Sequence, residues 1–253
     1  VLQTALAQTT HYVNDGSMAG DMFTAAVGNN GNPGTSALPF LTLSHAIFMA
    51  SANDTIQVDV GTYPEKVIIT KSLYIRGAKY GQDARTRSKI SGESILDGST
   101  IPGAPYDAIK IANGVNGVCI DGFEIAYYNG SGLNGDGNGI SSYCMGGNTL
   151  GANNVMIQNN YIHDIAYNGI MIGSQNYVGA SMVMQSGYTI QFNKISGYTY
   201  AGIELTNTVS SQVLENELDA PTSLFNDPGD AGVGIEIAAR SRARAANVTA
   251  ITV

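Results

Sequence analysis

The segment Asn134–Gly139 has the spacing of a calcium-binding loop. It reads Asn-Gly-Asp-Gly-Asn-Gly, so side-chain oxygens alternate with glycines as in the first half of such a loop. The candidate ligands are Asn134, Asp136 and Asn138. The twelfth position should supply a bidentate carboxylate, but Met145 stands there. We therefore favour a glycine-rich turn, with a Ca²⁺ site as the alternative.

Two glutamates, Glu204 and Glu236, could form a carboxylate pair of the kind that glycosidases use. Each is the third residue of a Gly-Ile-Glu-aliphatic segment. If these segments stack as neighbouring strands, the carboxylates lie about 5 Å apart, which suits a retaining glycosidase. Because no third partner accompanies the pair in the sequence, we favour a solvated, non-catalytic pair.

These segments belong to a repeat. The pattern Gly-Ile-x-Ile, or a close relative, places its first isoleucine at positions 109, 140, 170, 203 and 235. Such regular steps are typical of a solenoid, in which each repeat forms one coil. The third positions should then stack in one outward-facing row, formed by Lys110, Ser141, Met171, Glu204 and Glu236.

A second repeated strand contains an asparagine two residues before its last aliphatic residue. Its copies are Ile157–Ile162, Ile190–Ile195 and Val213–Leu218, with a weaker copy at Ile120–Ile125. The asparagines are Asn160, Asn193 and Asn216. Asparagine tolerates tight-turn backbone angles, and stacked asparagines can hydrogen-bond to one another. We predict a structural asparagine ladder rather than a binding site lined by asparagine.

Short strands of this kind, joined by turns, predict an all-β right-handed parallel β-helix. The N-terminal part differs, because Phe40, Leu43, Ile47 and Ala50 share one face of a helix predicted over 40–51. A solenoid end needs such a cap. We predict one domain over 12–253, with the cap and first coils over 12–80 and repeat coils over 81–253. Residues 1–11 are then a signal remnant or an N-terminal extension.

The composition favours an extracellular protein. Only 13% of the residues are charged and the net charge is −8, which argues against nucleic acid and anionic membrane surfaces as partners. No apolar stretch is long enough to span a membrane. Ala5-Leu6-Ala7 fits a signal cleavage pattern, so we expect a secreted or cell-surface protein. Cys119 and Cys144 could pair in an oxidising compartment, but we favour two unpaired thiols.

The N-terminal third contains a series of short motifs, namely Tyr12–Gly16, Gly28–Thr35, Pro39–Ile47, Asn53–Ile56, Val60–Glu65 and Leu73–Ala78. Together they resemble the opening of secreted right-handed β-helix proteins of the pectate-lyase-like superfamily, closest to those of Bacteroidetes-type bacteria. The resemblance covers 12–80 by motif and 105–253 by repeat. It implies the fold and secretion, whereas proteins with this opening include lyases, hydrolases, epimerases and adhesins.

The resemblance names the residues that an enzyme of this superfamily would need. A polysaccharide lyase of this superfamily needs a Lys or Arg base, often beside Ca²⁺ held by acidic residues. The basic residues group at Lys79–Lys89 and Arg240–Arg244, with no acidic cluster beside them on the repeat face, so we interpret the first group as a solvated loop. Pectin hydrolases have paired Asp and Gly-His-Gly, and neither occurs around His11, His45 or His163. A non-catalytic protein is therefore favoured over a lyase.

Residues 247–253 resemble the start of another coil. An open end would expose strand edges and apolar side chains, with Val248, Ile251 and Val253 as candidate contacts. A longer parent protein or an edge-covering strand would equally account for this segment. We predict an extracellular structural protein that can form filaments from copies of itself. The alternatives are a polysaccharide lyase and a glycan-binding adhesin that uses Tyr127, Tyr128 and Tyr143. Thr55 is a candidate glycosylation site.

Overall fold

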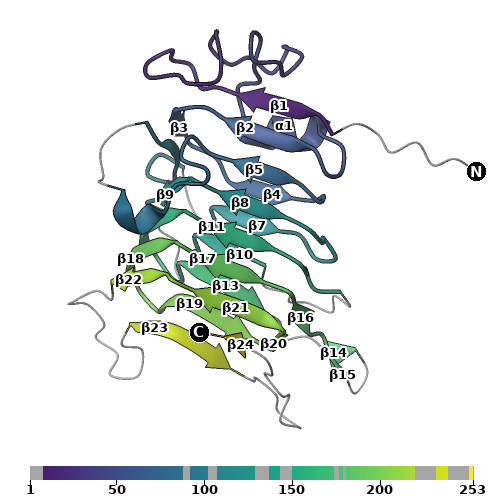
Figure 1. Cartoon of the computed structure of the whole chain (residues 1–253), viewed down its shortest axis with the longest axis vertical. Coiled ribbons are helices and arrows are strands. Elements are labelled where there is room, and N and C mark those ends of the chain that lie inside the picture. The colour runs from purple at the N-terminus through teal and green to yellow at the C-terminus, as the bar shows by residue number, and fades with distance from the viewer. Residues whose placement is uncertain are drawn as a thin grey trace, which may run out of the picture.

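A computed structural model describes residues 8–87, 92–101, 107–128, 137–142, 150–173, 177–178, 181–219, 232–238 and 251–252. The strands lie one below another along the long axis, from β1 near the N-terminus to β23 and β24 near the C-terminus (Figure 1). Within the described residues, no helix has the length and apolar character needed to cross a membrane.

Three parallel sheets form the walls of the coil. Sheet A has the order β1-β2-β5-β8-β11-β17-β21-β24, which are Thr10–Val13, Thr55–Val58, Tyr74–Arg76, Cys119–Asp121, Met156–Gln158, Thr189–Gln191, Ser211–Leu214 and Ile251–Thr252. Sheet B has the order β22-β18-β12-β9-β6-β3, which are Glu217–Asp219, Lys194–Tyr198, Tyr161–Ile165, Glu124–Ala126, Ser94–Asp97 and Gly61–Tyr63. Sheet C has the order β23-β19-β13-β10-β7-β4, which are Val233–Ala238, Ala201–Thr206, Ile170–Gly173, Ile140–Ser141, Ile109–Ile111 and Val67–Ile69.

Four short strands lie outside these walls. They are β14 (Tyr177–Val178), β15 (Ser181–Met182), β16 (Gln185–Ser186) and β20 (Thr208–Val209), and η1 (Ala84–Thr86) is a single 3-10 turn. Consecutive wall strands pair with strands one coil away, always in parallel. The predicted right-handed parallel β-helix is confirmed.

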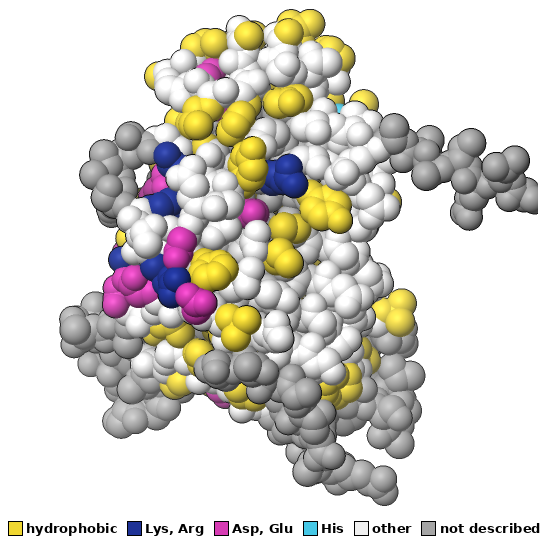
Figure 2. Space-filling view, in the orientation of Figure 1, with side chains coloured by type: hydrophobic (Ala, Val, Ile, Leu, Met, Phe, Trp, Pro, Cys, Tyr) yellow, Lys and Arg dark blue, Asp and Glu magenta, His cyan; other side chains and the backbone are white. Residues whose placement is uncertain are grey.

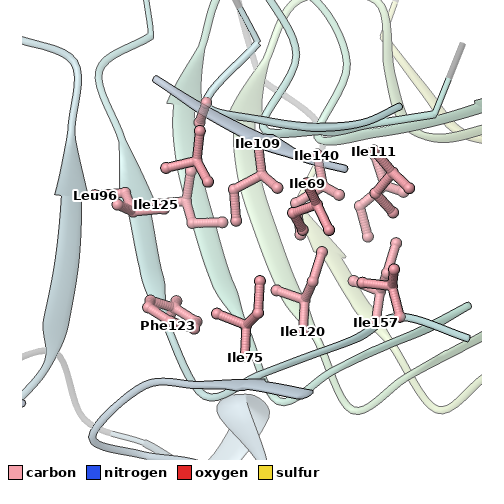
Figure 3. Packing of buried hydrophobic residues seen from close by; sticks show 14 of the residues in the cluster. Ile69, Ile75, Leu96, Ile109, Ile111, Ile120, Phe123, Ile125, Ile140 and Ile157 are labelled. Atoms are coloured by element: carbon pink, nitrogen blue, oxygen red, sulfur yellow. The ribbon is translucent and has the colours of Figure 1, made fainter. Parts of the chain in front are cut away.

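Columns of aliphatic side chains fill the interior. The register pairs Ile140 with Ile109 and Ile170, and Ile203 with Ile170 and Ile235, as the first repeat predicts. The second repeat supplies matching columns on sheets A and B. Figure 3 shows Ile109 and Ile140 of sheet C facing Ile120 of sheet A across the coil. Each coil therefore contributes to one continuous core.

Helix α1, Leu43–Met49, covers the N-terminal end of the core. Leu43, Ala46 and Ile47 are buried, and the helix packs against β1, β2 and β4. Its first free backbone N–H groups donate to the Glu65 carboxylate, and Lys71 Nζ donates to the carbonyls at its last turn. These charges match the helix dipole. The predicted cap helix is confirmed, although it is shorter than 40–51. Strand β1 starts at Thr10, two residues before the predicted domain boundary.

The asparagines of the second repeat are hydrogen-bonded in a continuous ladder. Asn160 Nδ2 donates to Asn193 Oδ1 at 3.1 Å, and Asn193 Nδ2 donates to Asn216 Oδ1 at 2.9 Å. The same oxygens accept the backbone N–H of the preceding asparagine, at 3.0 Å in both cases. The remaining amide protons reach backbone carbonyls, such as Ile157 O at 2.9 Å from Asn193. The ladder ties the turns between sheets A and B together from coil to coil.

Candidate functional site

The outward face of sheet B has a row of charged and aromatic side chains. The register aligns Glu124 in β9, Tyr161 in β12, Lys194 in β18 and Glu217 in β22. Their strand neighbours point inward and include buried isoleucines, because side chains alternate along a strand. Lys194 Nζ lies 2.6 Å from Glu217 Oε1. One side of these strands thus builds the core while the other presents polar groups.

His163 joins two carboxylates on this face. Its Nδ1 lies 2.7 Å from Asp164 Oδ2, and its Nε2 lies 3.0 Å from Glu124 Oε1. Glu124 pairs with Tyr161 across the strands, so Glu124 is a diagonal neighbour of His163 and its long side chain can reach the ring. The residue directly opposite His163 is Ala126. That small side chain leaves space for the imidazole.

The imidazole of His163 is buried between two carboxylates. Only 3% of the side chain is exposed, and its ring lies 4.4 Å from the Tyr161 ring and 5.7 Å from the Tyr127 ring, centroid to centroid. Burial alone would lower the pKa of His163, but its hydrogen bonds and charge interactions with Glu124 and Asp164 raise it above the ordinary value. The protonated ring can donate to both carboxylates at once.

Asp164 and Tyr127 are the solvent-facing members of this cluster. Their exposed fractions are 53% for the Asp164 side chain and 39% for Tyr127. Both have left-handed backbone, with φ of 53° and 63°, at corner positions that follow the paired residues His163 and Ala126. On the next coil this corner is occupied by Gly197, with φ of 62°. A side chain there costs roughly 1–2 kcal/mol relative to glycine, so Tyr and Asp at these corners are candidates for a functional contribution.

A buried ion pair lies beside the cluster. Arg87 Nη1 is 3.0 Å from Glu93 Oε2, and the Arg87 side chain is only 9% exposed. Burial raises the pKa of Glu93; the charge of Arg87 opposes this shift and that of Glu124 adds to it. The pair is therefore electrostatically coupled to the histidine cluster. The interpretation of this basic segment as a solvated loop is wrong for Arg87.

Arg85, in η1, also has acidic partners. Its Nη2 lies 2.7 Å from Asp83 Oδ2 and 3.0 Å from Glu215 Oε2. Figure 2 shows basic and acidic side chains gathered on the left of the molecule, level with β18 and β22. Arg85 therefore has two carboxylate partners, and the expectation that no acidic cluster on the repeat face accompanies the basic groups stays a prediction. Lys89 and Arg240–Arg244 lie outside the described residues.

Asn138, from the predicted calcium loop, is buried in a second polar ladder. Its Nδ2 donates to Asp107 Oδ1 at 2.7 Å, and its Oδ1 accepts from Asn168 N at 3.2 Å. Asn134 and Asp136 lie outside the described residues. In the part of the chain that the structure describes, no three His, Cys, Asp or Glu side chains converge to hold a metal ion. Calcium at this loop stays a prediction.

The predicted outward row is aligned as expected, with Lys110, Ser141, Met171, Glu204 and Glu236 in register. Glu204, however, is buried. Its Oε1 accepts from Thr206 Oγ1 at 2.8 Å, and its Oε2 accepts from Asn168 Nδ2 at 2.9 Å. The expectation of a solvated Glu204–Glu236 pair is therefore wrong, because Glu204 is enclosed and its oxygens bind neighbouring side chains.

The other predicted residues are dispersed over the coil. Thr55 lies in β2, is buried, and accepts a hydrogen bond from Gln8 Nε2 at 3.0 Å, so glycosylation there would have to precede folding. Ile251 lies in β24 at the edge of sheet A. Val248 and Val253, the other candidate assembly contacts, lie outside the described residues.

The remaining tyrosine and cysteine predictions divide in the same way. Tyr128 is buried and its hydroxyl donates to Glu65 O, so it offers no ring to a glycan. Cys119 has a free thiol. Tyr143 and Cys144 lie outside the described residues.

Glu124, His163 and Asp164 were not predicted as a site. The signal that could have revealed them is the second repeat, which aligns Glu124 with Tyr161 and therefore Ala126 with His163. His163 lies two residues after Tyr161 on the same outward side of β12. It is therefore a diagonal neighbour of Glu124 and within reach of its side chain.

Comparisons with known proteins support the fold. A family model described as "Protein of unknown function (DUF1565)" matches residues 26–233. No curated protein matches the chain.

Two carbohydrate-active enzymes are among the similar solved structures. The GH136 lacto-N-biosidase from Eubacterium ramulus, as its selenomethionine derivative, is 14% identical over 90% of this chain and 50% of its own length, with a TM-score of 0.50. Its native form is 12% identical over 81% of this chain and 44% of its own length, with a TM-score of 0.48. A rhamnogalacturonan lyase is 14% identical over 93% of this chain and 63% of its own length, with a TM-score of 0.44. The chain spans 44% to 63% of the length of these structures, and the likeness shows the fold alone.

Proposed function

Because the chain belongs to the DUF1565 family, whose description assigns no activity, we propose its function from its own residues: an extracellular carbohydrate-active protein with its site on the outward face of β9 and β12. The observation that supports this is the chain of Glu124, His163 and Asp164, which links an enclosed carboxylate through a buried imidazole to an exposed carboxylate. The secreted or cell-surface location remains part of the proposal.

The exposed members suit a sugar ring. Tyr127 offers an aromatic surface on which the apolar face of a pyranose can stack, and Asp164 offers carboxylate oxygens that can accept sugar hydroxyls. Both stand at neighbouring corners of the same sheet, one coil apart. A polysaccharide lying along the coil axis would meet them in succession.

The same groups can move a proton. Asp164 would touch the substrate and accept a proton from it or from water, while the His163 imidazolium holds the carboxylate in place and Glu124 holds the imidazole. His163 is a positioning residue in this scheme, because it is enclosed. Acid–base catalysis of this kind contributes roughly 10²- to 10⁴-fold in rate. The reaction class is cleavage of a glycosidic bond, by elimination or by hydrolysis, and the departing sugar oxygen takes its proton from water.

The test is a polysaccharide panel that includes uronate polymers and neutral or amino-sugar polymers. Elimination is followed by the ultraviolet absorbance of unsaturated products and hydrolysis by new reducing ends. We expect cleavage of at least one polymer, lost by about 100-fold or more in Asp164→Asn. The matched control is Asp219→Asn, an exposed carboxylate on the same face in β22.

The outcomes separate the candidate functions. Cleavage that survives in Asp164→Asn would overturn the assigned role. Binding to immobilised glycans without turnover, lost in Tyr127→Ala, would favour an adhesin. If the chain shows no cleavage and no glycan binding, the carbohydrate proposal is overturned and the structural interpretation remains.

The structural interpretation has its own support in β23. This strand is the last described strand of sheet C, and its Val233 and Ile237 are exposed apolar residues. We propose as a second candidate that this edge pairs with another copy of the chain, as a non-catalytic filament would require. Electron microscopy of native material would show filaments, and Ile237→Lys would disperse them. Single particles at all concentrations would refute self-assembly.

A further inference from the structure

The loop 14–28 folds over the start of sheet B and is anchored by one carboxylate. Asp59 Oδ1 accepts from Met22 N at 2.7 Å, and its Oδ2 accepts from Phe23 N at 2.9 Å and Thr24 N at 2.8 Å. The hydroxyl of Thr24 donates to the same Oδ2 at 2.7 Å. This loop is distant in sequence from the histidine cluster and from the predicted calcium loop.

Two buried oxygens of this loop have no donor. The side chain of Asn14 is fully buried, and its Nδ2 donates to Asp21 Oδ2 at 2.7 Å and to Ala26 O at 2.9 Å. Both acceptors fix the orientation of the amide, so the unpartnered atom is Oδ1. Asp21 Oδ1 is also buried and unpartnered.

Three carboxylates act on this place without a compensating cation. Asp21 accepts from the Asn14 amide, and Asp59 accepts from three backbone N–H groups of the same loop. Asp15 Oδ2 accepts from Thr62 N at 2.9 Å, which holds it at the same end of the coil. In the described ranges, no Lys, Arg or His forms an ion pair with any of the three. The loop therefore combines the negative charge of these three carboxylates with two buried oxygens that have no hydrogen-bond donor.

We propose that Asn14 Oδ1 and Asp21 Oδ1 bind a hard divalent cation, Ca²⁺. The donors are all oxygens, which Ca²⁺ prefers, and Ca²⁺ accepts the irregular geometry of a loop more readily than Mg²⁺ does. Within the described residues no three acidic side chains converge here, so the other ligands would have to be backbone carbonyls and water. Sites of this kind in extracellular modules have a Kd of roughly 10⁻⁴–10⁻³ M. The cation would fasten the N-terminal loop over the start of sheet B.

Thermal unfolding of the full chain at pH 7.5, in a chelator and then in 5 mM CaCl₂, tests the proposal. With the Kd above, we expect the melting temperature to rise by about 2–5 °C in Ca²⁺. Asp21→Asn keeps an oxygen but removes the charge, and it should lose more than half of that rise. Asp219→Asn is the surface control and should keep the full rise.

Two further measurements distinguish this site from a Ca²⁺ ion bound elsewhere and from a bound proton. Asp136→Asn alters the other predicted calcium loop, and the rise should persist in it; loss of the rise there would overturn the assignment to Asn14 and Asp21. A proton on Asp21 could also satisfy the two oxygens. Stabilisation on lowering the pH to 5, with no effect of Ca²⁺ at pH 7.5, would show that a proton fills the place and would refute the cation site. If Asp21→Asn does not fold, equilibrium dialysis of the unaltered chain against Ca²⁺ decides, and no bound ion refutes the proposal.

Discussion

Replacing Asn193 with alanine tests whether the asparagine ladder stabilises the coil. Asn193 is fully buried and makes four side-chain hydrogen bonds. The substitution deletes the oxygen that accepts from both Asn160 N and Asn160 Nδ2. It also deletes the amide that donates to Ile157 O and Asn216 Oδ1. The Asn193 backbone N–H still reaches Asn216 Oδ1 at 3.0 Å.

The size of the effect follows from the groups left without a partner. Two buried protons of Asn160, one backbone and one amide, lose their acceptor. Each orphaned buried group costs about 1–3 kcal/mol, so the free energy of unfolding should fall by about 3–5 kcal/mol. Asn216→Ala is the matched control. It orphans two protons of Asn193, but Asn216 is half-buried, so water can replace it and about 1–2 kcal/mol is expected.

Guanidinium unfolding followed by far-ultraviolet circular dichroism measures both variants, because the chain has no Trp to report tertiary structure. The slope of the free energy with denaturant should stay the same if only stability changes. A loss below about 1 kcal/mol for Asn193→Ala, or an equal loss in both variants, would refute the view that buried ladder bonds hold the turns together.

Three further predictions concern charge, backbone and thiol chemistry. Because the pKa of His163 is raised, its ionic bonds stabilise the fold fully below the ordinary value of about 6.5, and this contribution is lost as the pH rises through the raised pKa. His163→Gln should therefore flatten the fall in unfolding free energy above about pH 6.5, and a pH profile unchanged by the substitution would contradict this. Gly122 and Gly81 both have left-handed backbone, but an added Cβ would lie 2.1 Å from a backbone nitrogen at Gly122 and meets nothing within 4 Å at Gly81. Gly122→Ala should cost about 3 kcal/mol or more and Gly81→Ala only about 1 kcal/mol, and equal denaturation midpoints would contradict this. Burial raises the pKa of Cys119 to about 12. In a Cys144→Ser background its thiol should therefore react with a disulfide reagent at pH 8 only after unfolding, and rapid reaction of the folded chain would oppose this.

The fold could be predicted because the residues that face the core recur at the same position of every coil. Isoleucines such as Ile140, Ile170 and Ile203 must point inward on every coil, so the number of residues between them equals the number of residues in one coil. The asparagines at the turns repeat for a similar reason, since each needs the next one as its hydrogen-bond partner. Repetition makes these positions visible in one sequence without any alignment.

The candidate site could not be predicted in the same way because its members do not repeat. Glu124 reaches His163 from 39 positions earlier in the chain, and Asp164 reaches it from the adjacent corner. The enclosure of Glu204 also escaped prediction, because the strand pattern gives its direction but not what covers it. Arg87 was misjudged because its buried partner Glu93 is not at a repeat position of the coil.

This contrast indicates where function is located in such a coil. Along the inward column of sheet B the residues are Ile125, Ile162, Ile195 and Leu218, which are interchangeable in shape. Along the outward column they are Ala126, His163, Ser196 and Asp219, which share neither size nor charge. Packing can explain the first column, because every coil must fill the same space. It cannot explain the second column, where Ala126 and Ser196 are small enough to leave room for one imidazole between them. A site built from one large polar residue between two small ones depends on the order of coils, so a β-helix can acquire or lose it without any change in its core.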